Sequence, residues 1–319
     1  MNGRRNFFSR WQNQAALAIV AIFIFLAIGA PYLAPLTDPE EPSAFRVIED
    51  LKGNSPFPPG QKAWMGTIPT GIRGTQMDVY YTLVWGTRSA LRFGLLVALL
   101  TALVGVLLGA FSAFFGGIFN NLIMRITDAF LAFPIIVGVV IFQQLADLPN
   151  RMVEMQVLTT ERVEAASNPL LRLITSIDPV MLALILFSWM AYTRLTNTQV
   201  LRVRQTDFVV AARSLGAGAF RLVFRHLIPN AISPAIVLLA RDIGGMVLMQ
   251  ASLTFIGMGG GSEWGELLAL GRRWIIGPGG NPLTYWWVFL PLTLALVLFG
   301  IGWNLLGDGL NDWLNPRQA

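Results

Sequence analysis

The sequence predicts an all-α polytopic membrane protein with six transmembrane helices and a helical hairpin on the cytoplasmic side. Of its 319 residues, 54% are hydrophobic and only 13% are charged, whereas about 25% of the residues in soluble domains are charged. Six apolar stretches approach or exceed the length of about 20 residues that a helix needs to cross the hydrocarbon core. They cover residues 15–36, 93–117, 126–148, 179–194, 231–257 and 285–306.

The residue inventory also excludes several functions. The sequence has no cysteine and one histidine, His226, so it can form neither a thiolate nucleophile nor a zinc site built from these residues. Neither Lys52 nor Lys62 follows a glycine, which rules out a Walker A phosphate-binding loop. We therefore expect no catalytic residue, metal or cofactor in this chain. The net charge of +5 would suit nucleic acid, but the apolar excess indicates a bilayer instead, and we expect no nucleic-acid partner.

Residues 1–36 are expected to form a cytoplasmic N-terminus and the first transmembrane helix. Arg4, Arg5 and Arg10 precede the apolar stretch without any acid, and three acids follow it within positions 38–41. Positive charge favours the cytoplasmic side, so the N-terminus is placed there, and six spans bring the C-terminus to the same side. A cleaved signal peptide is the alternative. Because five further spans follow, we expect an uncleaved anchor.

Two segments, 37–91 and 149–178, are expected on the outer face. Residues 37–91 form an extracytoplasmic loop rich in proline, glycine and charge. Residues 92–319 form a core of five transmembrane helices, which includes the outer loop at 149–178. That outer loop mixes charged and apolar residues, which indicates an amphipathic surface helix ended by Asn168 and Pro169. The fourth apolar stretch is short, but residues 195–201 can continue its helix.

Several residues in or near the spans are expected to serve structure. Gly105 and Gly109 form a GxxxG pattern that permits close helix packing. The glycine-rich run that starts at Gly257 indicates a turn or hinge, because no Walker-type residues accompany it. The remaining expectations are an interfacial pair of Arg125 and Asp128, Arg194 near the inner end of the fourth span, and an aromatic belt of Trp264, Trp286 and Trp287.

The loop at 202–230 is the most informative part of the sequence, and its first half predicts a short helix. Thr206 or Asp207 can cap this helix, which runs to about Leu215. Gly216 and Gly218 flank an alanine just beyond it, and they permit the left-handed residue that often ends a helix.

The second half of the loop predicts an amphipathic helix. Arg221 and Arg225 share its polar face, and Pro229 is expected to stop it before the fifth span. The opposite, apolar stripe follows the spacing i, i+3, i+4, i+7 and consists of Phe220, Val223, Phe224 and Leu227.

A helical hairpin of this kind can act in two ways. It can lie in the lipid interface with its arginines toward the headgroups, or it can dock into a groove on a soluble partner. The small residues Ala211, Ala212 and Gly216 allow close approach of a backbone, which favours docking.

The loop resembles the EAA loop of ABC-type importer permeases. In that pattern Glu-Ala-Ala is followed after three residues by glycine and later by an apolar-x-Leu-Pro ending. The corresponding residues here are Val210-Ala211-Ala212, Gly216 and His226-Leu227-Ile228-Pro229. Val210, His226 and Ile228 depart from the pattern. The resemblance therefore implies that this chain lacks one polar contact with the ATPase but keeps the hairpin.

The resemblance extends from about Met65 to Arg317 and is closest to the dipeptide and oligopeptide branch of these permeases. Segments similar to that branch lie at 85–91, 116–117, 132–134, 251–257 and 304–310. Two segments, 68–77 and 150–178, are longer than is usual in the branch. Both are expected on the face where a binding protein would dock.

The resemblance implies a permease subunit of an ATP-driven importer that works by alternating access in a prokaryotic inner membrane, with both termini cytoplasmic. The implied partners are a second homologous permease, two ABC ATPase subunits that bind ATP and Mg, an extracytoplasmic solute-binding protein, the lipid bilayer, and a peptide or similar solute. The residues implied for coupling to the ATPases are Asp207, Ala211, Ala212, Gly216, Arg221, Arg225 and Pro229.

Polar residues of the fifth span are candidates for the translocation path. Arg241 and Asp242 lie about eleven residues into the expected span, roughly 17 Å deep, where a charge is costly. Neighbours on a helix point about 100° apart, so the two are poor partners for each other. They either line the path or pair with another helix or subunit. Gln250, where the branch often has glutamate, is the third candidate.

Other interpretations remain open. A secondary transporter or channel would need no ATPase, but the hairpin would then have no function. A membrane-embedded enzyme is nearly excluded, because no acid, serine or cysteine stands at a catalytic spacing from His226. Di- or oligopeptides are the favoured cargo, although nickel chelates, opines and sugars use related permeases.

Overall fold

The computed structural model describes residues 7–36, 43–71, 74–154, 178–277, 281 and 283–314. The chain divides into two compact units. Unit 1 comprises Met1–Ser9, Leu96–Asp242 and Gly307–Ala319, and unit 2 comprises Arg10–Leu95 and Ile243–Leu306. Three of the four boundaries fall inside long helices, so each of these helices contributes residues to both units.

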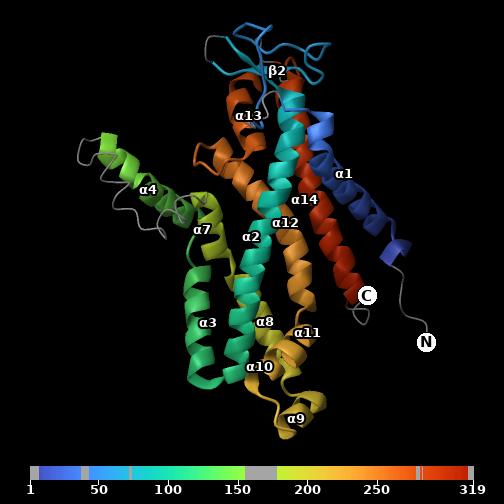
Figure 1. Cartoon of the computed structure of the whole chain (residues 1–319), viewed down its shortest axis with the longest axis vertical. Helices are drawn as coiled ribbons and strands as arrows, with labels where there is room; N and C mark the ends of the chain where they lie inside the picture. Colours follow the sequence, from blue (N-terminus) through green and yellow to red (C-terminus); the bar gives the residue numbers. More distant parts are fainter. Residues whose placement is uncertain are drawn as a thin grey trace. The chain divides into compact units, whose positions relative to one another are not determined.

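Unit 2 contains helices and one small sheet (Figure 1). Its elements are α1 (Trp11–Leu33), β1 (Val47–Ile48), β2 (Thr67–Pro69), β3 (Gln76–Asp78), the first part of α2 (Val79–Phe115), much of α12 (Ser233–Phe255), α13 (Glu263–Gly271), the 3-10 turn η3 (Arg272–Trp274) and most of α14 (Trp286–Leu314).

The sequence analysis did not expect this sheet. Its strands are antiparallel in the order β1-β3-β2. β2 and β3 pair from Thr67 with Asp78 to Pro69 with Gln76. The described residues of the segment 68–77, the first of the two long segments, therefore include most of β2 and β3. The buried side chain of Gln76 accepts a hydrogen bond from the Thr67 hydroxyl at 2.8 Å and donates to the Gly53 carbonyl, which ties the preceding loop to the sheet.

Asp78 joins the sheet to α2. Its carboxylate accepts hydrogen bonds from the backbone N–H groups of Tyr80 at 3.0 Å and Tyr81 at 3.3 Å, as a helix cap does. It also pairs with Arg46. The side chain is only 1% exposed, so this charge is satisfied by a cap and an ion pair together, and the start of α2 is fixed to the loop that carries Arg46.

The core of unit 2 corrects the expected aromatic belt. Trp264 is 1% exposed and its indole N–H donates to the Leu83 carbonyl at 3.1 Å. Its ring contacts those of Phe23 and Phe299 at centroid distances of 6.2 and 6.1 Å. The approach depends on Gly86, where a Cβ would lie 2.5 Å from the Trp264 ring. Trp264 is thus a core residue, and so is Trp287, whereas Trp286 is exposed as a belt residue would be.

Unit 1 is helical throughout the part of it that the structure describes. It contains the 3-10 turn η1 (Phe7–Ser9), the remainder of α2, α3 (Gly117–Leu131), α4 (Ile135–Glu154), α7 (Pro179–Ser188), α8 (Met190–Val203), α9 (Asp207–Ser214), α10 (Ala219–Arg221), the π-helical turn η2 (Leu222–Leu227), α11 (Ile228–Ala231), the start of α12 and the end of α14.

The GxxxG pattern of α2 supports close helix packing, as predicted, and the structure adds that the partner is α8. A Cβ at Gly105 would lie 2.4 Å from the Tyr192 Cβ, and one at Gly109 would lie 2.5 Å from the Thr193 carbonyl oxygen. The Thr193 hydroxyl in turn donates to the Gly105 carbonyl at 3.2 Å. Only glycine permits backbones to approach this closely.

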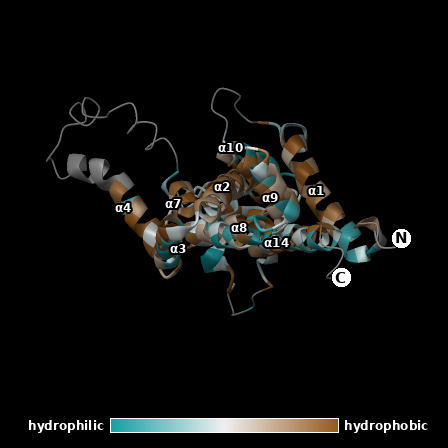
Figure 2. Cartoon of the chain, turned by 90° about the horizontal axis from the view of Figure 1, so that it is seen from below, coloured by the Kyte–Doolittle hydropathy of each residue, from teal (hydrophilic) through white to brown (hydrophobic). Residues whose placement is uncertain are grey.

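Five described helices are long and apolar enough to span a membrane, and a sixth span results if one bent pair is counted (Figure 2). The bent pair is α3 with the start of α4, which meet at 84°. A continuous third span over 126–148 was therefore the wrong prediction. The physical reason is Pro134, which lacks an N–H and disfavours helix at the residue before it. The fourth span continues to Val203, as expected.

Asp128 of α3 pairs with Arg194 of α8 at 3.3 Å, and both side chains are exposed. The expected pair with Arg125 of the same helix is wrong, because the packing of α3 on α8 brings a more distant residue in the sequence into reach. The amphipathic helix expected to end at Asn168 and Pro169 lies outside the described residues. Within those residues, α4 continues to Glu154.

Candidate functional site

The hairpin comprises α9, α10, η2 and α11, residues 207–231, and follows directly after α8 (Figure 1). Arg204, between α8 and α9, donates from Nη1 to the carbonyls of Ala113 at 2.8 Å and Phe114 at 3.3 Å. These carbonyls belong to the last turn of α2, where basic groups are favoured. Arg204 thus fixes the start of the hairpin to the end of α2, a role that sequence spacing could not reveal.

The turn of the hairpin has the predicted geometry. Gly216 adopts φ +83°, and its N–H donates to the Arg213 carbonyl at 3.0 Å. The N–H of Ala217 donates to the Ala212 carbonyl at 3.1 Å. These two bonds form a Schellman motif, which satisfies the last carbonyls of α9. Thr206 occupies the cap position of α9, but its hydroxyl donates to Val203 at 2.6 Å instead of capping the helix.

A buried cluster locks the hairpin to the ends of α2 and α8. Its hairpin members are Val209, Leu222, Val223, Leu227 and Ala231, and its other members are Ala110, Ala113 and Val200. Ala212 and Ala217, the two residues joined by the Schellman bond, pack against the same cluster. The hairpin is therefore packed into unit 1 against the helix ends that it covers.

The predicted apolar stripe is only half right. Val223 and Leu227 are buried, but Phe220 is 71% exposed, and its ring lies tilted against that of Phe224 with the centroids 4.4 Å apart. The cause is the π-helical turn η2, in which the Ile228 N–H bonds the Val223 carbonyl five residues back. This extra residue rotates Phe220 out of the stripe and brings Leu222 in. Pro229 does not stop the helix, because it lies at the first positions of α11, where no N–H is needed.

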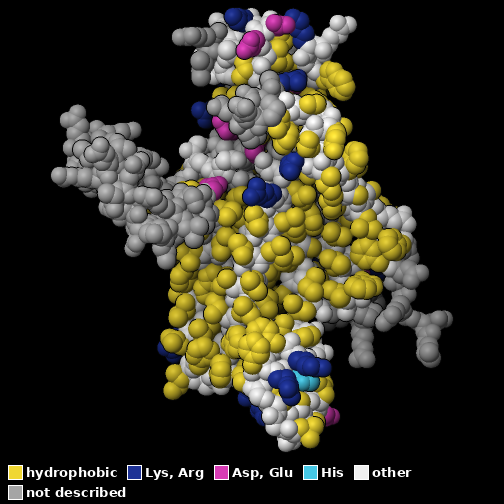
Figure 3. Space-filling model, viewed as in Figure 1, with side chains coloured by type: hydrophobic (Ala, Val, Ile, Leu, Met, Phe, Trp, Pro, Cys, Tyr) yellow, Lys and Arg dark blue, Asp and Glu magenta, His cyan; other side chains and the backbone are white. Residues whose placement is uncertain are grey.

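The exposed face of the hairpin offers both apolar and basic groups. Leu215 is 89% exposed, and the other exposed apolar side chains are Phe208, Val210, Phe220 and Phe224. Figure 3 shows basic side chains gathered around the histidine at this end of the molecule. Of the predicted coupling residues, Ala212 is half-buried against the cluster, and the exposed ones are Asp207, Ala211, Gly216, Arg221, Arg225 and Pro229.

The charged residues of α12 have partners within unit 1. The Tyr192 hydroxyl donates to the Asp242 carboxylate at 2.7 Å, and Arg241 pairs with Asp308 of α14. Gly307 leaves space for the stem of Arg241, since a Cβ there would lie 2.7 Å from its Cγ. These contacts favour the structural alternative that the sequence left open. A role in the path stays a prediction.

Gln250 also makes a structural contact. It is 6% exposed, and its amide donates to the Gly260 carbonyl. The Thr254 hydroxyl donates to the Gly259 carbonyl at 2.8 Å. Both contacts hold the glycine-rich connection between α12 and α13, in which Gly260 adopts φ +106°. The run is thus a turn, as predicted, and Gln250 fastens it.

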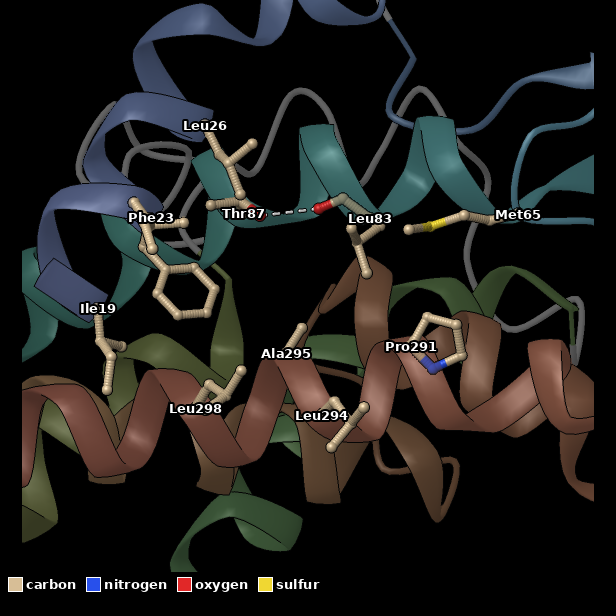
Figure 4. Close-up of a pocket in the computed structure, with 11 residues that line it drawn as sticks. Ile19, Phe23, Leu26, Met65, Leu83, Thr87, Pro291, Leu294, Ala295 and Leu298 are labelled. Carbon is tan, nitrogen blue, oxygen red and sulfur yellow. Dashed lines mark hydrogen bonds between the residues drawn. The ribbon is translucent and has the colours of Figure 1, made fainter. Parts of the chain in front are cut away.

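One pocket lies in unit 2 between α1, α2 and α14 (Figure 4). Its volume is 310 Å³ and its lining is apolar, including Phe23, Leu26 and Leu294. The Thr87 hydroxyl on the wall is bonded to the Leu83 carbonyl at 2.8 Å. The pocket therefore presents no free polar group with which to recognise a polar solute. Among the described residues, no group of three or more acids and histidines could hold a metal ion.

Comparison with known proteins gives a consistent result. Residues 105–319 match the family described as binding-protein-dependent transport system inner membrane component. A probable D,D-dipeptide transport system permease protein of Escherichia coli K12 is 30% identical over 304 residues, which are 94% of this chain and 86% of that protein. A dipeptide transport system permease protein of Alkalihalophilus pseudofirmus is 28% identical over 95% of this chain and 84% of its own. A nickel transport system permease protein of Escherichia coli K12 is 29% identical over 98% of this chain and 97% of its own.

Proposed function

Because the chain belongs to the family of inner membrane components of binding-protein-dependent transport systems, we propose that it is a permease subunit of an ATP-driven ABC importer for short peptides. Separate subunits bind and hydrolyse ATP. The observation that carries the proposal is the hairpin, which is locked to the ends of α2 and α8 and leaves apolar and basic residues exposed.

A coupling element must be rigid and must expose an apolar face to its partner, and the hairpin meets both needs. The buried cluster and the Arg204 contacts join the hairpin to the ends of α2 and α8, so a displacement of the hairpin displaces those helix ends. The residues that meet the ATPase are then the exposed ones, among them Asp207, Ala211 and Arg221. Ala212 and Gly216 act indirectly, because they shape the turn.

The remaining partners follow from the same proposal. The chain pairs with a second, homologous permease, two ATPase subunits that bind ATP and Mg, and an extracytoplasmic solute-binding protein. Both termini and the hairpin face the cytoplasm, and the sheet segment faces the binding protein. Transport proceeds by alternating access, in which ATP binding favours one state of the permease pair because the two states differ in their contacts with the ATPases. The chain itself is non-catalytic.

The test is affinity purification of the tagged chain in mild detergent, with identification of the proteins that accompany it. We expect a second permease and two ATPases with the wild type and with Ala211→Ser. We expect their loss with Ala211→Asp, because Ala211 is exposed and a charge there would be desolvated on docking. Ala212 is a poorer probe, since a charge there would disrupt the hairpin's own packing.

Two results would overturn the proposal. One is retention of the ATPases and of normal uptake by Ala211→Asp. The other is a chain that purifies alone and still transports in liposomes without ATP, which would establish the alternative of a secondary transporter or channel.

A further inference from the structure

One face of α2 is turned toward the end of α1, within unit 2. A buried cluster joins the two helices there, and its members are Ala30, Ala34, Tyr81 and Val84. The Trp85 indole N–H donates to the Ala34 carbonyl at 2.8 Å, on the same side. Arg88 and Arg92 follow Trp85 at three and seven residues, so they continue this face along α2.

The two arginines stand where α2 enters the hydrocarbon. Both are exposed, and they are the last charged residues before the apolar run at 93–115. That run is about as long as the hydrocarbon core is thick. The guanidinium carbon of Arg88 lies 5.6 Å from the centroid of the Trp85 ring. Because Trp85 is one turn nearer the start of α2, Arg88 points away from the apolar run, as an arginine does when it reaches toward the headgroups.

The charges of this pair are not neutralised. In the part of the chain that the structure describes, neither Arg88 nor Arg92 has an ion-pair partner. The contact with Trp85 orients one cation without neutralising it. Glu263 does not serve the pair, because its carboxylate is bound by Ser89 on the neighbouring face of α2.

The position of the pair is costly in two ways. Like charges four residues apart on a helix repel each other, and a charge beside the hydrocarbon is unfavourable unless it meets water or an opposite charge. An anion that contacts both guanidinium groups reduces both costs.

The nearby surface of α1 indicates which anion this is. The exposed side chains near the end of α1 are apolar or aromatic, and they include Phe25, Ile28 and Tyr32. Only 28% of the apolar window of α1 is buried, the lowest share among the five described candidate spans. A solute path needs polar surroundings, whereas basic and aromatic residues above an apolar surface are typical of a boundary with lipid.

We propose that Arg88 and Arg92 bind the phosphate group of an anionic phospholipid, in the leaflet nearest the sheet segment. Their paired N–H donors suit phosphate oxygens, and Trp85 holds Arg88 in place for this contact. The acyl chains lie along the apolar run of α2. The inference goes beyond the importer function, because it concerns the lipid that surrounds the chain and not the solute.

The net charge of the headgroup decides between lipids. The described contacts of the pair contain two cations and no carboxylate. An anionic headgroup complements this charge, whereas a zwitterionic headgroup brings a further cation close to the two arginines. We therefore expect phosphatidylglycerol to bind more tightly than phosphatidylcholine.

The experiment titrates the full-length chain, with any subunits that copurify, in a neutral detergent with each lipid, and counts the bound lipid by native mass spectrometry. We expect Arg88→Gln and Arg92→Gln each to raise the Kd for phosphatidylglycerol about fivefold. Arg92→Lys should raise it less, because lysine keeps the charge but not the paired donors. The matched control is Arg273→Gln, another exposed arginine over an aromatic ring, which should leave the Kd unchanged.

Four outcomes would overturn the inference. One is an equal Kd for the wild type and both glutamine variants, and another is equal binding of the two lipids. Displacement of phosphatidylglycerol by an equal concentration of inorganic phosphate would assign the arginines to a free anion. Loss of lipid binding whenever a second permease copurifies would assign them to a subunit interface. None of these results bears on the importer proposal, which fails only on its own tests.

Discussion

Replacing Gly216 by alanine isolates the backbone cost of the hairpin turn. Gly216 has φ +83°, and a Cβ built there meets no atom within 4 Å. The substitution therefore adds no clash, and its whole cost is that of placing an L-residue in the left-handed region, about 1–2 kcal/mol. Gly218 is the matched control, because its φ is −67° and its Cβ would also meet nothing within 4 Å. Alanine there reduces the freedom of the unfolded chain but caps α10 less well, so we expect a change within about 0.5 kcal/mol.

The assay is hydrogen exchange of the α9 amides with the chain in nanodiscs. A cost of 1–2 kcal/mol corresponds to roughly a 5- to 30-fold faster exchange through local opening. We expect this acceleration in Gly216→Ala and exchange close to the wild type in Gly218→Ala. Equal exchange in the two variants would refute the argument that the turn requires a left-handed residue at 216.

Three further predictions concern the contacts that hold the hairpin and the spans. Gly109→Val should abolish recovery of folded chain, because a Cβ at this position would lie 2.5 Å from the Thr193 carbonyl oxygen. The control is Gly245→Val, which should be recovered normally because a Cβ at Gly245 meets no atom within 4 Å. Equal yields of the two variants would count against the α2–α8 packing. Arg204→Met leaves the Ala113 and Phe114 carbonyls without their donor, so it should lower the free energy of unfolding by about 1–3 kcal/mol, measured by thermal unfolding. Arg204→Lys should lower it by less. An Arg204→Met variant as stable as the wild type would contradict the cap. Asp78→Asn keeps an acceptor for the cap but loses the charge that pairs with Arg46, so it should lower the melting temperature less than Asp78→Ala, and the reverse order would contradict the dual role.

The spans were predictable because hydropathy depends only on the local sequence and not on how the helices pack. Pro134 in the sequence also indicates the break between α3 and α4. The prediction gives more weight to the apolar residues on both sides of Pro134 and therefore expects one continuous span. At Pro229 the prediction errs in the opposite direction. It ends the helix there, although the chain remains helical and accommodates the proline by a π-helical turn. A proline shows where a helix is perturbed, and its neighbours decide whether the result is a bend, a bulge or a new first turn.

The partners of the charged residues could not be predicted. Arg204 meets carbonyls 91 and 90 residues away, and Arg241 meets Asp308 at a separation of 67. No spacing rule connects positions that only tertiary packing brings together. The hairpin turn at Gly216 was predictable for the opposite reason, because its bonds join residues three and five apart. The extra length at 68–77 was visible in the sequence, but the pairing of β2 with β3 was not.

The π-helical turn η2 holds one residue more than the α-helical turn it replaces. Passing that residue along the chain would convert the turn to regular helix, and in an α-helix one residue corresponds to about 100° of rotation and 1.5 Å of rise. The segment between α10 and α12 therefore holds one residue more than a regular α-helix of the same rise would need. Deleting one residue from this turn would rotate α9 and α10 by about 100° relative to α12, whereas most single substitutions there leave the register of the hairpin unchanged.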